Sequence, residues 1–396
     1  MHSRMEKETS QIKLARLTPI VRGLLAERTG KPDTPYAPII LKSLTTKKAI
    51  AFSTSAENTD SADYPAPLTK GDGPPLFINN INADDTPQIR KQLSDAISAH
   101  SSRYGVKPTI ICLSGLGVLH VEQKDNTDLP LANKVALITG AAGAIGYGIC
   151  RGLLENGCRV AVSDLPGEKL DNFAADLNQT WPDRTVGAAI DVTDAESVVA
   201  GLDRIIQTWG GIDIVAVNAG IAMVCRLKEM DLEAFRKLER VNVEGTLLTL
   251  REIARHFVLQ ATGGDIVIVS TKNVPSPGAG FGAYSATKAA CHQLGRIASL
   301  ELAEFGVRVN MVAPDGVFSE GKYKSGLWAE VGPDRMRARG LDEKGLAEYY
   351  RNRNLLKIQI TGRHVANAVL FFATRQAPTT GITLPVDGGL PDATPR

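Results

Sequence analysis

The fold is decided by residues 135–146, VALITGAAGAIG, an apolar strand that runs directly into a glycine-rich turn. A helical pattern follows over Tyr147–Glu155. A strand, a turn of small residues and a helix in this order present backbone N–H groups at a helix N-terminus, where they can bind the pyrophosphate of a dinucleotide. The residues predicted to line this cofactor site are Gly140, Gly143, Ala144, Ile145 and Gly146.

Short β-branched strands alternate with longer helical stretches from Lys134 onward. The expected strands are Val135–Thr139, Arg159–Ser163, Val186–Ile190, Ile212–Val217, Asp265–Ser270, Arg308–Val312 and Ile382–Val386. Alternation of this kind is typical of a parallel sheet with crossover helices. The sequence therefore predicts an α/β fold with a Rossmann-type doubly wound parallel sheet.

The residues before this region differ in character. Pieces rich in proline and glycine separate one helical pattern, Ile89–His100, from one strand-like apolar run, Thr109–Leu113. The stretch Lys124–Pro130 is polar and ends in proline, which indicates a linker. We expect a smaller N-terminal α/β extension over residues 1–128 and a nucleotide-binding domain over residues 129–396.

The composition excludes several classes of protein. The 396 residues carry a formal net charge of +2, which gives no reason to expect nucleic acid or an anionic membrane as a partner. The five cysteines are odd in number and form no CxxC pair. No uninterrupted apolar run approaches the ~18 residues of a membrane span. We expect a cytoplasmic protein that binds a small-molecule substrate.

Asp164 ends the second expected strand and is followed by Leu165. A carboxylate at this place can accept hydrogen bonds from the adenosine ribose, and it would repel the 2′-phosphate of NADP. No lysine or arginine lies within the glycine-rich turn to offset that repulsion. NAD is therefore the predicted cofactor, although an aspartate here could also simply cap the next loop.

Tyr284 and Lys288 lie four residues apart in the segment GAYSATKAA, hence on one face of a helix. A phenol with its ordinary pKa near 10 is a poor base at neutral pH, but a neighbouring ammonium is expected to lower that pKa. Tyr284 could then exchange a proton with an alcohol. Such a pair alone is more often part of an exposed helix face, so this prediction depends on the other motifs.

Several motifs in the same order give the chain from Leu131 to about Arg396 a resemblance to the short-chain dehydrogenase/reductase family. Besides the glycine-rich turn, Tyr284 and Lys288, they are Asp191-Val192, Asn218-Ala219-Gly220, Asn242 and Asp387-Gly388-Gly389. The resemblance implies an NAD-dependent enzyme that interconverts a secondary alcohol and a ketone.

The resemblance also implies a role for each motif. Tyr284 would be the acid/base, Lys288 would bind ribose and tune the phenol, and Asn242 would hold a water-linked proton relay. The cofactor would further contact Asp191, Val192, Asn218, Ala219, Gly220, Pro314, Gly316 and Val317. The family's middle glycine of the turn is Ala144 here, which adds a methyl group where backbone should approach phosphate.

Two residues could supply the hydroxyl that polarises the substrate. The family's catalytic serine lies 13 residues before the tyrosine, which corresponds to Thr271, and Ser270 stands beside it. Either hydroxyl can donate to a carbonyl. Because side chains alternate along a strand, only one of the two can face the cleft, and the spacing favours Thr271.

A long segment, residues 319–360, precedes the last helix, where this family carries its substrate lid. Its many basic residues, Arg335 and Arg353 among them, suit an acidic or polyhydroxylated substrate, although charged residues often form only a solvated face. Lys272 and Trp328 are predicted substrate contacts. We expect a small polar, sugar-derived or hydroxy-acid substrate.

The pieces before residue 129 show a second resemblance. They are Thr18-Pro19, Arg22-Gly23-Leu24-Leu25, Pro75-Leu76-Phe77 and Ser114-Gly115-Leu116-Gly117-Val118, and they resemble the latter part of a class II aldolase module. In bacterial proteins of rhamnose-type sugar degradation, that module is fused ahead of a similar dehydrogenase. Aldolases of this class hold a divalent metal with several histidines, whereas this part contains only His2, His100 and His120 and no HxH pair.

The N-terminal part is accordingly predicted to be a degenerate module without a metal site, used for packing, oligomerisation or lid support. We expect a homodimer or a homotetramer. Two alternatives stay open: a bifunctional aldolase/dehydrogenase, and a non-catalytic NAD-binding sensor or scaffold.

Overall fold

The computed structural model describes residues 2–54, 64–65, 67–68, 73–81, 85–125, 127–319, 321–323 and 325–391. Two positions of the expected lid, Glu320 and Lys324, lie outside these residues, as do the last five residues of the chain. The chain divides into two compact units. The first consists of Met1–Asn126, Leu202–Ile212 and His256–Thr262, and the second of Thr127–Gly201, Asp213–Arg255 and Gly263–Arg396.

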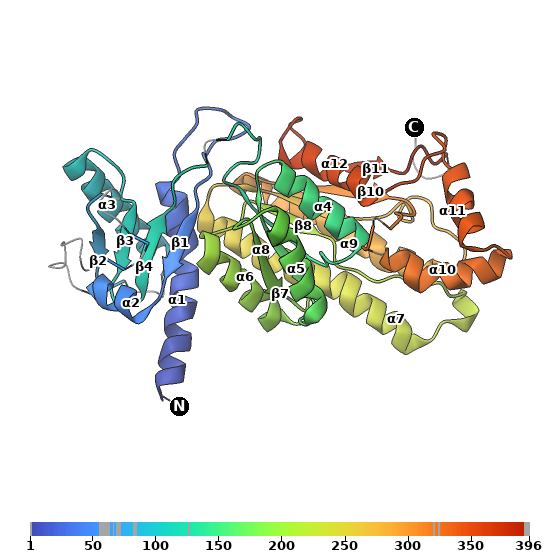
Figure 1. Cartoon of the computed structure of the whole chain (residues 1–396), viewed down its shortest axis with the longest axis horizontal. Helices are drawn as coiled ribbons and strands as arrows, with labels where there is room; N and C mark the ends of the chain where they lie inside the picture. The colour runs from blue at the N-terminus through green and yellow to red at the C-terminus, as the bar shows by residue number, and fades with distance from the viewer. Residues whose placement is uncertain are drawn as a thin grey trace. The chain divides into compact units, whose positions relative to one another are not determined.

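The second unit is built on a seven-stranded parallel sheet with the order β11-β10-β9-β8-β5-β6-β7 (Figure 1). Its strands are β5 Val135–Ile138, β6 Arg159–Asp164, β7 Thr185–Ala189, β8 Ile214–Val217, β9 Gly264–Val269, β10 Val307–Pro314 and β11 Thr383–Val386. The chain runs outward from β5 to one edge and then from β8 to the other, which is the order of a doubly wound fold. The predicted Rossmann-type fold is confirmed.

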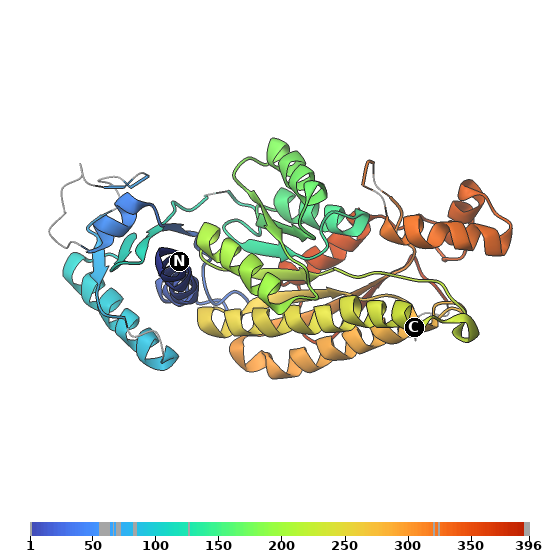
Figure 2. The same ribbon diagram turned by 90° about the horizontal axis from the view of Figure 1, so that it is seen from below.

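Helices cover both faces of this sheet (Figure 2). They are α4 Ala144–Glu155, α5 Glu168–Thr180, α6 Ala195–Trp209, α8 Gly245–Gln260, α9 Gly282–Glu301 and α12 Gly362–Ala373. The helices α7 Leu232–Leu238, α10 Gly326–Arg339 and α11 Glu343–Asn352 lie away from the sheet faces (Figure 1). The central strands β5, β8 and β9 are buried along their whole length, because a sheet covered on both faces leaves neither side to water. Their continuous apolar runs follow from that burial.

The helices α4 and α12 pack against each other through two glycines. A Cβ atom on Gly148 would come 2.2 Å from the carbonyl carbon of Gly362, so no other residue fits without moving a helix. This close crossing fixes the direction of α4. The N-terminus of α4 is thereby held at the carboxyl end of β5.

The first unit contains a four-stranded sheet with the order β1-β4-β3-β2. Its elements are α1 His2–Leu25, β1 Leu41–Leu44, α2 Lys47–Thr54, β2 Leu76–Ile78, α3 Thr86–Tyr104, β3 Ile110–Leu113 and β4 Gly117–Val121. β2 and β3 are parallel, with α3 as their crossover, and β4 pairs antiparallel with β3 and β1. The sequence predicted α3 and β3 but not the other five elements.

A buried polar cluster ties the three segments of the first unit together. The side chain of Arg22, 2% exposed, donates to the carbonyl of Ile39 (2.8 Å) and to Oε1 of Gln260 (2.8 Å). Gln260 Nε2 in turn donates to the carbonyl of Ile212 (2.9 Å). This cluster could not be predicted from the sequence, because residues 202–212 and 256–262 have the pattern of ordinary helix ends.

A chain that begins at Leu129 is expected to bind NADH but to unfold at a lower temperature. It lacks Arg22, so the buried amide of Gln260 loses a partner, and the fully buried Phe257 loses part of its packing within the first unit. Together these losses should lower Tm by at least about 5 °C, measured by circular dichroism. An unchanged Tm would show that residues 202–212 and 256–262 are stable without the N-terminal part.

None of the helices in the described part of the chain has both the length and the apolar character needed to cross a membrane.

Candidate functional site

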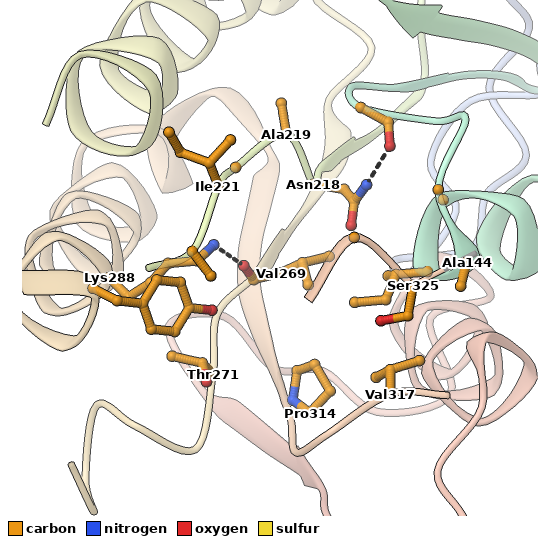
Figure 3. A pocket seen from close by; sticks show the side chains of 18 of the residues that line it. Ala144, Asn218, Ala219, Ile221, Val269, Thr271, Lys288, Pro314, Val317 and Ser325 are labelled. Atoms are coloured by element: carbon orange, nitrogen blue, oxygen red, sulfur yellow. Dashed lines mark hydrogen bonds between the residues drawn. The ribbon is translucent and has the colours of Figure 1, made fainter. Parts of the chain in front are cut away.

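A pocket of about 600 Å³ opens where β5, β6, β8, β9 and β10 end (Figure 3). The carboxyl ends of parallel strands meet at one edge of the sheet, and the direction of winding reverses between β5 and β8. Of the predicted site residues, the pocket is lined by Gly140, Gly143, Ala144, Ile145, Gly146, Asp164, Leu165, Asp191, Val192, Asn218, Ala219, Gly220, Ser270, Thr271, Lys272, Tyr284, Lys288, Pro314, Gly316 and Val317. Asn242 and Trp328 do not line it.

The glycine-rich turn leaves room for a phosphate. Gly140 has a φ of +60°, and a Cβ atom there would come 2.7 Å from Cα of Ala219. Around Gly143, in contrast, the space that a Cβ atom would take is empty. The first N–H groups of α4 follow directly, with no side-chain cap at Gly143. An open cradle at a helix N-terminus fits the pyrophosphate of a dinucleotide.

Ala144 does not fill this cradle. The residue is only 2% exposed, so its methyl group adds little to the open surface. Asn218 holds the turn in place, because its Nδ2 donates to the carbonyls of Gly140 (2.7 Å; Figure 3) and Thr139 (3.1 Å). The turn therefore keeps its shape without the family's middle glycine.

The far end of the pocket carries the carboxylate of Asp164. Its Oδ2 accepts from the backbone N–H of Ala142 (3.1 Å) and from Nζ of Lys169 (3.3 Å). Lys169 also lines the pocket, and it belongs to none of the motifs identified in the sequence. The glycine-rich turn itself contains no lysine or arginine, as the sequence showed, but α5 supplies a cation to Asp164 from outside the turn. Asp191 accepts from the backbone and hydroxyl of Thr193, which shapes the loop after β7.

The structure separates the two candidate hydroxyl groups. The side chain of Thr271 stands beside Tyr284 within the pocket, where its hydroxyl lowers the pKa of the phenol. The hydroxyl of Ser270 instead lies 3.1 Å from Nδ1 of His292. The two side chains point in different directions, as expected for adjacent residues at the end of strand β9, because successive side chains of a strand alternate in direction. Thr271 is therefore the hydroxyl that stands beside the phenol.

Burial raises the pKa of Tyr284 to about 12, and the nearby hydroxyl of Thr271 lowers it by less. The expectation that Lys288 would bring this pKa down is wrong for this structure. Lys288 is itself buried, which lowers the pKa of its ammonium, and its Nζ donates to the carbonyl of Val269 (2.9 Å; Figure 3). Removal of the phenol from water outweighs the neighbouring charge.

Asn242 lies one layer behind the pocket, in the π-helix η4 Glu239–Glu244. Its Oδ1 accepts from the N–H of Ile221 (2.9 Å), and its Nδ2 donates to the carbonyl of Ile221 (3.0 Å) and to Oγ1 of Thr287 (3.0 Å). All of its side-chain polar groups thus bind protein. In this arrangement Asn242 connects the loop after β8 to α9, which carries Tyr284 and Lys288.

On its lid side, the pocket is lined among others by four residues of which only the two arginines were predicted from the sequence. Arg353 forms a bidentate pair with Asp315, and Tyr350 and Arg335 stand beside it in the wall. The two arginines belong to the predicted basic lid. Tyr350 and Asp315 had no motif of their own, because their contacts join residues far apart in the sequence.

The predicted substrate contacts have different outcomes. Lys272 lines the pocket, and its Nζ donates to the carbonyl of Ser276 (3.1 Å). Trp328 lies outside the pocket, because its Nε1 donates to the carbonyl of Val317 (2.8 Å) and its ring packs against Phe318 and Tyr350. Trp328 joins α10 to the loop after β10 and does not line the pocket.

Among the described residues, no group of three histidine, cysteine, aspartate or glutamate side chains is arranged to hold a metal ion.

Comparisons with known proteins agree with this geometry. The short chain dehydrogenase family matches residues 134–328. The uncharacterized oxidoreductase YuxG of Bacillus subtilis strain 168 is 37% identical over 267 residues, which cover 67% of this chain but only 38% of that protein. The mitochondrial (-)-isopiperitenol/(-)-carveol dehydrogenase of Mentha piperita is 33% identical over 264 residues, or 66% of this chain and 94% of that enzyme.

A solved structure adds a view of a ligand complex. The gluconate 5-dehydrogenase from Burkholderia cenocepacia J2315, in complex with NADP and tartrate, is 27% identical and aligns with a TM-score of 0.57. The alignment covers 66% of this chain and 96% of that structure. Through its second unit, the chain belongs to the short-chain dehydrogenase/reductase family of oxidoreductases.

Proposed function

We propose that the chain is an NAD-dependent dehydrogenase that interconverts a secondary alcohol and a ketone on a small polar, sugar-derived or hydroxy-acid substrate. The observation that carries this proposal is the placement of the Thr271 hydroxyl beside Tyr284 in the pocket, with Lys288 one helical turn from Tyr284. The gluconate 5-dehydrogenase relative, solved with tartrate, supports a hydroxylated substrate.

The pocket offers a place for each part of the cofactor. The N-terminus of α4 and Gly143 would hold the pyrophosphate, Asp164 the adenosine ribose, and Val192 the adenine. Lys288 and the loop from Pro314 to Val317 would hold the nicotinamide half. When bound, the nicotinamide would accept a hydride from the alcohol carbon or return it to the ketone.

The chain's own residues would handle the proton. Thr271 would donate a hydrogen bond to the substrate oxygen, and Tyr284 would move a proton between its Oη and that oxygen. The high pKa of Tyr284 keeps the phenol protonated at neutral pH, so it is ready to act as an acid in ketone reduction. In alcohol oxidation the phenol must first lose its proton, and burial of the phenol opposes that step.

A turnover screen tests the proposal. The absorbance of NADH would be followed with sorbitol, gluconate, tartrate, lactate and 1,2-propanediol, and with the matching ketones in the reverse direction. We expect turnover with at least one hydroxylated class and a preference for NAD over NADP. Tight NADH binding without turnover of any secondary alcohol or ketone would instead favour the sensor or scaffold alternative.

The choice of cofactor is expected to depend on the pair formed by Asp164 and Lys169. Asp164→Asn keeps an acceptor for the N–H of Ala142 but removes the charge that repels a 2′-phosphate, and it leaves Lys169 without its ion pair. We expect the ratio of kcat/KM for NAD over NADP to fall by at least about 10-fold. Adding Lys169→Ala should restore part of the preference for NAD, because it removes the cation that would bind the 2′-phosphate of NADP. A wild-type enzyme that already prefers NADP would refute this assignment.

We propose further that the first unit is a degenerate aldolase-like module and that the enzyme is a homodimer or homotetramer. Light scattering measures the oligomeric state directly. The bifunctional alternative requires aldol cleavage by the full chain that survives Tyr284→Phe and disappears with a chelator. Detection of that activity would show that the module is not degenerate.

A further inference from the structure

The pocket wall contains an arginine close to the proposed acid/base. Arg335, on α10, lines the pocket with its guanidinium carbon 4.4 Å from the ring centroid of Phe281. The Phe281 ring in turn lies 6.1 Å from the ring of Tyr284, centroid to centroid. A single aromatic ring therefore separates a fixed positive charge from the residue that would exchange the substrate proton.

The charge of Arg335 has no carboxylate partner within the described residues. Its Nε is buried and makes no hydrogen bond there, and its stacking on Phe281 leaves the edge of the guanidinium for other groups. A buried N–H without an acceptor costs free energy, so such groups are normally paired with protein, water or a ligand. The Nε of Arg335 therefore points to a bound acceptor.

Neighbouring arginines of the lid are satisfied within the protein. Arg353 pairs with both carboxylate oxygens of Asp315, and Arg337, on the same helix as Arg335, pairs with Asp334 (2.7 Å). The difference lies in position, because Arg337 is exposed whereas Arg335 faces the pocket. Arg335 is thus placed for a ligand while its neighbours are placed for structure.

A second unsatisfied group stands in the same wall. Asn273 is buried, lines the pocket, and its Oδ1 has no hydrogen-bond partner within the described residues. An amide oxygen accepts from a hydroxyl but repels an oxyanion. Arg335 and Asn273 therefore complement a molecule that carries both an anionic group and hydroxyl groups.

We propose that Arg335 determines specificity by binding a carboxylate or phosphate of the substrate, so that the pocket takes anionic hydroxylated molecules, either hydroxy acids or sugar phosphates. This inference rests on the proposed dehydrogenase function and narrows its substrate class. The planar guanidinium offers parallel N–H groups that match two oxygens of either anion. A neutral polyol of the same length would leave the Arg335 charge unpaired.

The test compares Arg335→Gln with Arg337→Gln, a matched change on the same helix. The values of kcat/KM would be measured with gluconate, with sorbitol 6-phosphate and with neutral sorbitol. For the wild type we expect at least one anion to be preferred over sorbitol. Arg335→Gln should lower kcat/KM for that anion by about 10- to 100-fold, mainly through KM, and that for sorbitol by less than about threefold. Arg337→Gln should change neither.

The two anionic substrates, gluconate and sorbitol 6-phosphate, distinguish carboxylate recognition from phosphate recognition. Loss confined to gluconate assigns a carboxylate, and loss confined to sorbitol 6-phosphate assigns a phosphate. Equal losses for anionic and neutral substrates, or no loss, would overturn the proposal. Arg335→Lys, which keeps the charge but not the planar pair of donors, should fall between the wild type and Arg335→Gln, and it replaces the latter if that variant does not fold.

A binding measurement separates this inference from the proposed function. The complex with NADH would be titrated with tartrate and with inorganic phosphate, using NADH fluorescence. We expect Arg335→Gln to weaken binding of at least one of these anions by about 10-fold or more. If no alcohol is turned over, the dehydrogenase proposal fails, yet weakened anion binding still supports the anion site. The anion-site proposal would be overturned if the wild type bound neither anion, or if Arg335→Gln bound both as tightly as the wild type.

Discussion

Tyr284→Phe is expected to lower kcat by at least about 100-fold in both directions while the affinity for NADH stays within about threefold of wild type. The substitution removes only the hydroxyl that would carry the substrate proton, and the remaining ring keeps its packing against Phe281. Steady-state kinetics with the best substrate, together with an NADH fluorescence titration, measure the two effects separately. Turnover at the wild-type level would rule out Tyr284 as the acid/base.

The pH dependence gives an independent check on the same residue. Burial raises the pKa of Tyr284 to about 12, so the phenol is protonated throughout the neutral range. The rate of alcohol oxidation, which needs the deprotonated form, should therefore increase with pH through this range. Ketone reduction should stay nearly constant because its acid is already present. In Tyr284→Phe, the residual oxidation rate should lose this increase with pH.

The second large effect is expected at the residue beside it. Thr271→Val keeps the shape of the side chain but deletes the hydroxyl that stands beside Tyr284. We expect kcat to fall by at least about 100-fold, because the substrate oxygen loses its donor and the phenol loses the hydroxyl beside it. Thermal unfolding should show a change of Tm of only a few degrees, since only one hydroxyl group is removed.

The matched control for Thr271→Val is Ser270→Ala. The hydroxyl of Ser270 lies against His292, whose second nitrogen lies 3.3 Å from the hydroxyl of Thr383 on β11. Its loss should lower kcat by less than about threefold and affect mainly stability. The reverse result, a large effect at Ser270 and a small one at Thr271, would assign the catalytic hydroxyl to Ser270.

The secondary structure of the larger unit was predictable because short stretches of its sequence mark each strand. Each buried strand is a short run of β-branched and apolar residues, and each predicted strand overlaps an observed one within a few residues. The first unit was harder to predict. Its strands β1 and β2 have only four and three residues, and α1 contains Pro19, so neither strand length nor helical periodicity marks them clearly.

The site, too, has one part that could be predicted from the sequence and one part that could not. The cofactor wall was predictable, because loops that follow parallel strands meet at one edge of the sheet. Three features depend on tertiary contacts that no pattern encodes: the burial that raises the pKa of Tyr284, the approach of Lys169 to Asp164, and the turn of Trp328 away from the pocket. The choice between Thr271 and Ser270 required the direction of two adjacent side chains at the end of β9.

The π-helical segment Glu239–Glu244 constrains how this protein can change in length. A π-turn holds one more residue than an α-turn, and each residue of an α-helix advances about 100° around the axis. Deleting one residue here would rotate Asn242 away from Ile221 and Thr287, however well the remaining residues suit a helix. Insertions and deletions in this segment are thus expected to be more damaging than substitutions at positions other than Asn242. The number of residues, together with the Asn242 amide, keeps the loop after β8 aligned with the helix that carries Tyr284.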